Sequence, residues 1–99
     1  MTETIDETTV LKFNKNILKR YEHNYKNGTM ILYDIDREEA WFGNSSAREL
    51  INLIDGKTNL EDIYAELFPF YKAENIEMVI ESFNSVIEDL YSKKFIEIA

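Results

Sequence analysis

The sequence predicts an α+β domain in which a three-stranded antiparallel sheet is followed by three helices. Two patterns lead to this prediction. Before Gly43, apolar residues occur in short runs separated by turn residues, as in antiparallel strands. After Gly43 they recur with the 3.6-residue period of amphipathic helices. The length of 99 residues suits one compact domain, and a hydrophobic fraction of 44% is enough to fill its core.

The three strands are predicted between residues 17 and 43. Residues 17–23, which begin with Ile17-Leu18, and the apolar run 29–33 lie on either side of Asn27-Gly28, a dipeptide typical of turns, and they predict a hairpin. A polar stretch follows at 34–38. The aromatic run 40–42, which ends at Gly43, predicts a short third strand.

Residues typical of helix ends delimit the first two predicted helices. The first is predicted to begin at residues 44–46, where Ser46 and Glu49 have the spacing of a capping box, and to stop at Gly56. The second is predicted to begin with Asn59 as its N-cap and to stop before Pro69. Their apolar positions are Ala47, Leu50, Ile51 and Ile54 in the first helix, and Leu60, Ile63, Tyr64 and Leu67 in the second.

The third helix is predicted to run from a cap at Asn75 to about Lys93. Its apolar stripe is roughly 140° wide, whereas an ordinary core-facing stripe spans roughly 100°. One flank can therefore face a binding groove, although the pattern is equally compatible with both flanks in the core. Residues 95–98 alternate and predict a last short strand or a clasp on the core. The stripe comprises Ile76, Val79, Ile80, Phe83, Val86, Ile87, Leu90 and Tyr91.

The chain is predicted to consist of a tail and one domain. Residues 1–9 are acidic and rich in threonine, and Ile5 is their one sizeable apolar side chain after the initiator. Such a segment buries too little apolar surface to offset its conformational entropy. We therefore expect a mobile acidic tail over residues 1–16 and a single folded domain over residues 17–99.

The residue types that carry catalysis are sparse. The chain has no cysteine and His23 is its one histidine, so thiolate chemistry and multi-histidine metal cages are excluded. Gly28, Gly43 and Gly56 stand too far apart for a glycine-rich phosphate loop. The carboxylates are scattered over helix positions predicted to face solvent. We therefore expect a protein that is not an enzyme and that holds neither a cofactor nor a metal ion.

Charge and hydropathy narrow the range of partners. A formal net charge of −8 opposes nucleic-acid binding, because Lys and Arg contacts to phosphate supply most non-specific affinity. No apolar run approaches the roughly 20 residues of a membrane span, and the chain does not begin with a basic and then apolar signal. We expect a cytoplasmic protein that contacts neither nucleic acid nor membrane.

Three antiparallel strands followed by three helices are the layout of a winged helix-turn-helix domain. Such a domain offers one helix for a DNA groove and, separately, an open sheet edge beside a helix. The acidic charge disfavours the first use. The second use is a known mode of peptide capture, in which an extended peptide adds a strand to the edge.

Three short motifs occur in order along the chain. They are the strand at residues 30–34, then Asn-Ser-Ser-Ala-Arg-Glu-Leu-Ile at 44–51, and then Asp-Gly-Lys-Thr-Asn-Leu-Glu-Asp-Ile at 55–63. Together they resemble the PqqD-like recognition elements of pathways that modify ribosomally made peptides. The family's motifs are Asn-x-Thr-Ala-x-x-Ile-Leu, and Asp-Gly followed by Thr-Leu-x-Glu-Ile. The resemblance covers about residues 29–98, with departures at Gly43, usually leucine, and Lys94, often glycine.

The resemblance implies a peptide-binding function. It implies that the leader of a precursor peptide pairs antiparallel with the third strand, here residues 39–43, and leans on the last helix. The expected partners are this precursor peptide and its modifying enzyme, for which a radical-SAM enzyme is one candidate. The domain is expected to be a monomer or a dimer formed through the free edge. The implied site residues are Glu39, Ala40, Trp41, Phe42, Gly43, Val79, Ile80, Phe83 and Ile87.

Two other interpretations stay open. A winged-helix transcription regulator that binds DNA would need a basic face on its second or third helix, and these helices carry chiefly acids. Alternatively, the chain is one domain of a larger modifying enzyme, since the family occurs both alone and fused.

Overall fold

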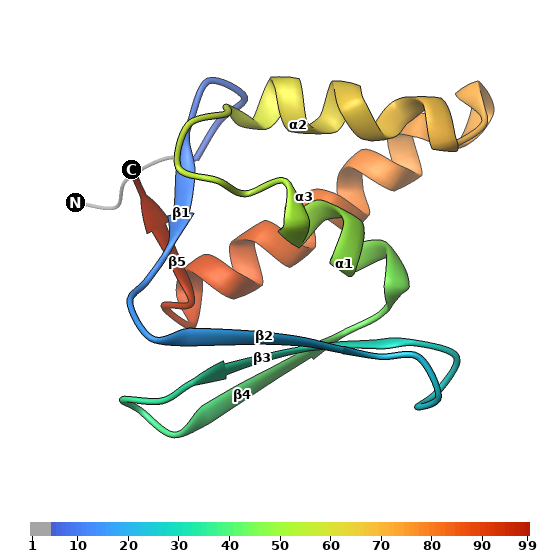
Figure 1. Ribbon diagram of the computed structural model, residues 1–99. Coiled ribbons are helices and arrows are strands. Elements are labelled where there is room, and N and C mark those ends of the chain that lie inside the picture. Colours follow the sequence, from blue (N-terminus) through green and yellow to red (C-terminus); the bar gives the residue numbers. More distant parts are fainter. Residues whose placement is uncertain (1–4) are drawn as a thin grey trace.

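The computed structural model describes residues 5–99, and it confirms an α+β arrangement with a three-stranded antiparallel sheet and three helices. Figure 1 shows this sheet as a layer below the helices, with a second, two-stranded sheet beside them. The elements are β1 (Leu11–Phe13), β2 (Ile17–Glu22), β3 (Thr29–Asp34), β4 (Glu39–Gly43), α1 (Ser45–Asn52), α2 (Leu60–Leu67), η1 (Phe68–Phe70), η2 (Ala73–Asn75), α3 (Ile76–Ser92) and β5 (Ile96–Ile98).

The three-stranded sheet has the order β2-β3-β4, and both neighbouring pairs are antiparallel. The predicted hairpin and third strand are therefore confirmed. Met30, Leu32 and Trp41 point into the core and are buried, whereas Tyr33 and Phe42 point to the outer face and are exposed. Alternate side chains of a strand face opposite sides of its sheet, which accounts for this difference in burial.

The predicted N-terminal tail is corrected for the described residues 5–16. β1 pairs antiparallel with β5, and Leu11 is 1% exposed in the core. The physical reason is that β5, at the other end of the chain, supplies the ladder partner that residues 11–13 need to be held against the core. Residues 1–4 of the predicted tail lie outside the described residues.

Asparagine side chains cap α1 and α2. The Oδ1 atoms of Asn44 and Asn59 each accept a hydrogen bond from the backbone N–H three residues later, both at 2.9 Å. The predicted cap at Asn59 is confirmed. The predicted capping box is corrected, because Ser46 lies inside the first turn of α1 and the capping position belongs to Asn44.

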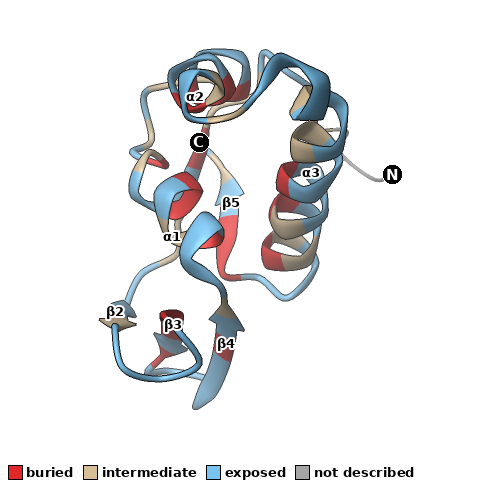
Figure 2. Ribbon diagram, turned by 90° about the vertical axis from the view of Figure 1, so that its right-hand side faces the viewer, coloured by how far each residue is buried: buried red, intermediate tan, exposed pale blue. Residues whose placement is uncertain are grey.

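The helix α3 supplies the centre of the core. Its buried residues are Phe83, Ile87 and Leu90. In Figure 2 the buried parts of α3, coloured red, lie on the side toward α1 and β5. Asn75 occupies the predicted N-cap position, but its side chain forms no capping hydrogen bond with any described residue, and the turn η2 leads directly into the helix. The predicted last strand is β5. Within residues 5–99, no helix is both long and apolar enough to cross a membrane.

Candidate functional site

The strand β4 forms one edge of the three-stranded sheet, and one hydrogen bond shows which of its main-chain groups face outward. The N–H of Ile35 donates to the carbonyl of Asn16 at 3.1 Å, which continues the β2–β3 ladder. The main-chain N–H and C=O groups of successive residues in a strand point to opposite sides, so those of odd-numbered residues of β3 point to β2 and those of even-numbered residues point to β4. Leu32 pairs with Trp41, so the main-chain groups of Trp41 point to β3. Those of Ala40 and Phe42 therefore point to the free side.

The side chains of β4 alternate between solvent and core in the same way. Ala40 and Phe42 are exposed, and Phe42 keeps 61% of its surface accessible. Glu39, at the start of the strand, forms an ion pair with Arg37 in which Oε2 and Nη1 are 3.4 Å apart. A peptide strand added here would gain main-chain hydrogen bonds at two residues and contact with one exposed aromatic ring.

Among the predicted site residues, Trp41 contributes its ring to the interface between β4 and α3. Trp41 is 7% exposed, and the Nε1–H of its ring donates to the carboxylate of Asp89 at 2.7 Å. It lies against Gly43, where an added Cβ atom would come 2.5 Å from the indole and 2.9 Å from the Cβ of Ala47. Glycine is therefore required at position 43 while Trp41 keeps its place.

A hollow of about 360 Å³ opens where β4 ends. Asn44, the residue that follows the strand, is part of its lining. Tyr71 and Phe83 pack edge-on against each other in its wall, with 6.0 Å between the ring centroids. The hollow therefore begins one residue beyond β4 and extends along the Val79 flank of α3. Its apolar lining comprises Ala47, Tyr71, Met78, Val79, Phe83 and Val86.

The two flanks of α3 face different surroundings. The structure brings Val79 and Phe83 together with the end of β4, but it places Ile80 and Ile87 on the opposite flank, toward α2. A helical wheel groups Val79 with Val86, seven residues later, yet it does not say which flank meets the sheet.

Sequence reasoning missed four further apolar residues in the hollow. Tyr71 and Met78 lie outside the predicted apolar stripes, and Ala47 and Val86 are predicted only as apolar helix positions. Tyr71 lies in an irregular segment between two helices, so no periodic pattern could identify it. Met78 lies outside the apolar stripe and is 69% exposed. The proximity of these side chains to β4 is a property of the folded chain.

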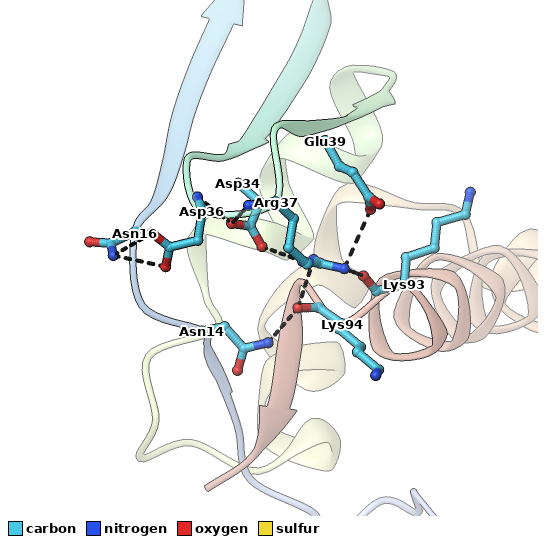
Figure 3. A network of polar contacts seen from close by, with 8 residues as sticks. All are labelled: Asn14, Asn16, Asp34, Asp36, Arg37, Glu39, Lys93 and Lys94. Atoms are coloured by element: carbon cyan, nitrogen blue, oxygen red, sulfur yellow. Dashed lines mark hydrogen bonds and ion pairs between the residues drawn. The ribbon is translucent and has the colours of Figure 1, made fainter.

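Arg37 joins the turn between β3 and β4 to the end of α3 (Figure 3). Its Nε donates to the carboxylate of Asp34 at 2.6 Å, and its terminal nitrogens donate to the carbonyl groups of Lys93 and Lys94 at 2.7 and 3.1 Å. Carbonyl groups at a helix C-terminus lack partners within the helix and carry negative partial charge, so a guanidinium is a favourable partner. This network holds the start of β4 beside the C-terminus of α3.

The folded protein is expected to lose stability as the pH falls below about 4. The hydrogen bond from Arg37 lowers the pKa of Asp34, and the hydrogen bond from Trp41 lowers the pKa of Asp89, both from an ordinary value of 3.8. A carboxyl group with a lowered folded-state pKa stabilises fully above its unfolded-state pKa, and this contribution is lost as the pH falls through the folded-state pKa.

Melting temperatures between about pH 2.5 and pH 7 would test this expectation on the wild type and on the single variants Asp34→Asn and Asp89→Asn. Each variant removes one titrating carboxyl group. Its melting temperature should therefore fall less steeply below pH 4 than that of the wild type. An unchanged slope in both variants would show that these two carboxylates are not the source of the acid sensitivity.

The described part of the chain holds few groups suited to catalysis. His23 is exposed, and its ring packs edge-on against Tyr21 with 4.7 Å between the centroids. Within residues 5–99, no three or more His, Asp or Glu side chains are grouped so that they could hold a metal ion. The edge of β4 and the hollow beside it offer hydrogen bonds and apolar contacts. Comparisons of the chain with protein-family models, with curated proteins and with solved structures find no match.

Proposed function

We propose that this chain binds the leader of a ribosomally made precursor peptide and presents it to a modifying enzyme, without turnover of its own. The proposal rests on two neighbouring features, which are the edge strand β4 with its outward main-chain groups and the apolar hollow next to the end of this strand. The leader adds an antiparallel strand at Ala40 and Phe42 and then places an apolar side chain in the hollow. In this proposal the fold is a winged helix-turn-helix that recognises its ligand through the sheet edge. A radical-SAM enzyme is one candidate for the modifying enzyme.

The edge of β4 is better suited to strand addition than the opposite edge, β2. β2 carries Lys19, Arg20 and Glu22, and charged side chains on an edge strand discourage pairing with another chain. In β4 the one charged residue is Glu39, at its first position. The pairing region ends at Asn44, because its carbonyl accepts a hydrogen bond from the Arg48 N–H of α1 at 3.2 Å.

The interactions on this edge allow an affinity in the micromolar range. Ala40 and Phe42 offer four main-chain hydrogen bonds, each worth roughly 0.5–1.5 kcal/mol net. One apolar side chain buried in the hollow adds roughly 1.5–3 kcal/mol. These contributions must offset the cost of ordering an extended peptide, so the expected dissociation constant is micromolar rather than picomolar.

Titration with candidate leaders tests the proposal. The ligands are synthetic N-terminal segments of the short open reading frames that neighbour the gene. Binding is expected as heat in calorimetry and as a change in the fluorescence of Trp41, the one tryptophan of the chain. Duplex DNA at about 150 mM salt is expected not to bind. The proposal is overturned if no candidate leader gives a response or if the protein retains DNA selectively.

Val86→Ser is expected to weaken leader binding, whereas Ile80→Ser is expected to leave it nearly unchanged. Both residues are half-buried aliphatic residues of α3, but Val86 lines the hollow beside β4 and Ile80 lies on the opposite flank. The lost apolar contact corresponds to roughly 1 kcal/mol, or about a fivefold change in the dissociation constant. Melting curves of both variants separate binding from stability. An equal loss of affinity in the two variants would show that the hollow does not hold the leader.

A further inference from the structure

A second cavity, of about 410 Å³, lies on the flank of α3 opposite to the hollow beside β4. Its walls come from α2, from α3 and from the segment that precedes β1. That segment is held in place by two hydrogen bonds, in which the N–H groups of Leu60 and Glu61 donate to the carbonyl groups of Thr9 and Glu7 at 3.1 and 2.9 Å. These hydrogen bonds fix this wall of the cavity against the start of α2. Its apolar lining comprises Ile5, Leu60, Tyr64, Phe68, Ile80 and Ile87.

The remaining lining of this cavity is strongly acidic. Asp6, Glu7, Glu61 and Glu88 line it, and among residues 5–99 no Lys, Arg or His does. None of the four carboxylates forms an ion pair with another described residue. Four negative charges around an apolar floor therefore lack a compensating positive charge within the described chain.

Tyr64 forms part of the wall of this cavity. Burial, and then the nearby carboxylate of Glu88, raises the pKa of Tyr64 to about 12. The Tyr64 hydroxyl donates to Oδ1 of Asn84 at 2.8 Å, so the ring is held against α3. A ligand that enters the cavity meets a fixed aromatic wall and a negative potential.

We propose that this cavity docks a basic, apolar segment of a second protein. Lys and Arg side chains lay their aliphatic stems on apolar surfaces and keep their charged heads at the rim, which matches the apolar floor and the carboxylates of this site. An acidic segment would be repelled by the same four carboxylates. This site is separate from the edge of β4 to which the proposed function assigns the leader peptide. Under the proposed function the second protein is the modifying enzyme, and that identification alone rests on the proposed function.

The two sites are independent in space. Leader peptide at β4 would contact the Val79 and Val86 flank of α3, and the basic segment would contact the Ile80 flank. Both can therefore be occupied at once, and each can be tested without the other.

A titration followed by amide NMR of the full chain tests this inference. The probe is an acetylated and amidated hexapeptide of alternating leucine and lysine, and the control peptide has glutamate in place of lysine. The lysine peptide is expected to shift the amide signals of residues that line the cavity, such as Leu60, Tyr64 and Ile80. Its affinity should fall as salt rises from about 20 mM to about 500 mM, because exposed charge pairs are screened.

The double variant Glu61→Gln/Glu88→Gln is expected to weaken the lysine peptide roughly tenfold, as two exposed charge pairs are lost. The matched control is Glu66→Gln/Glu81→Gln, which changes the same helices and the same net charge at exposed positions outside the cavity. It should bind the peptide nearly as the wild type does, and both variants should keep the wild-type melting curve. Equal weakening in both variants, equal binding of the glutamate peptide, or signal shifts confined to β4 would each overturn the inference.

Discussion

Trp41→Pro is expected to unfold the domain, whereas Ala40→Pro is expected to leave it folded and to remove leader binding. The Trp41 N–H faces β3, so proline at this position removes a ladder hydrogen bond inside the sheet. The same change removes a buried aromatic ring, which costs roughly 3–5 kcal/mol. A domain of this size is stable by only about 5–15 kcal/mol, so the combined loss leaves little folded protein.

The Ala40 N–H faces outward, where proline is tolerated within an edge strand. Ala40→Pro therefore keeps the sheet but takes away one donor and fills the space that an added strand would occupy. Leader affinity is expected to fall by tenfold or more, since a peptide carbonyl loses its partner. Phe42→Pro belongs to the same class.

Circular dichroism and leader titration measure the two effects. Ala40→Gly and Phe42→Ala are the matched controls, because they change the side chain and keep the N–H. If Ala40→Pro binds leader as tightly as Ala40→Gly does, the peptide does not add to this edge. If Trp41→Pro stays as stable as Trp41→Ala, the assignment of outward and inward groups along β4 is wrong.

Phe83→Ala is expected to destabilise the protein by roughly 3–5 kcal/mol. Phe83 is 3% exposed and touches two rings, Tyr64 at 5.3 Å and Tyr71 at 6.0 Å between centroids. Its loss leaves a cavity between α2, α3 and the segment that holds Tyr71. For a domain of this length, the melting temperature should drop by at least about 12 °C.

Thermal and urea unfolding curves would measure this loss, with Phe83→Leu as the control that keeps most of the apolar volume. Phe83 also lines the hollow beside β4, so the alanine variant should bind leader weakly even at temperatures where it is folded. A destabilisation below about 1 kcal/mol would contradict the position of Phe83 in the core.

The individual strands and helices of this fold could be predicted because interactions between residues close in the sequence specify them. Short apolar runs on either side of Asn27-Gly28 specify the hairpin of β2 and β3, and helical spacing specifies the buried faces of α1 and α2. Asn59 caps α2 as expected, since its side chain needs only a backbone N–H three residues away. Each of these predictions depends on residues that are neighbours in the sequence.

Other features depend on contacts between distant segments, and these could not be predicted. The strand β1 is only three residues long, and its ladder partner β5 lies at the other end of the chain. The pattern of α3 is symmetrical about Phe83, so only the packing of the helix on α1 and α2 decides that Val79, rather than Ile80, faces the end of β4.

The sequence alone therefore identified the strand that carries the candidate site and the residues of its apolar helix. The tertiary structure decided which of these side chains are buried and which main-chain groups of the strand are free. The Trp41 ring is buried because Asp89 of α3 accepts its N–H and Gly43 leaves room for the indole. Ala40 and Phe42 carry the free groups because the pairing of β2 with β3 sets the direction of every later ladder bond. Both outcomes arise from hydrogen bonds between segments that only the folded chain brings together.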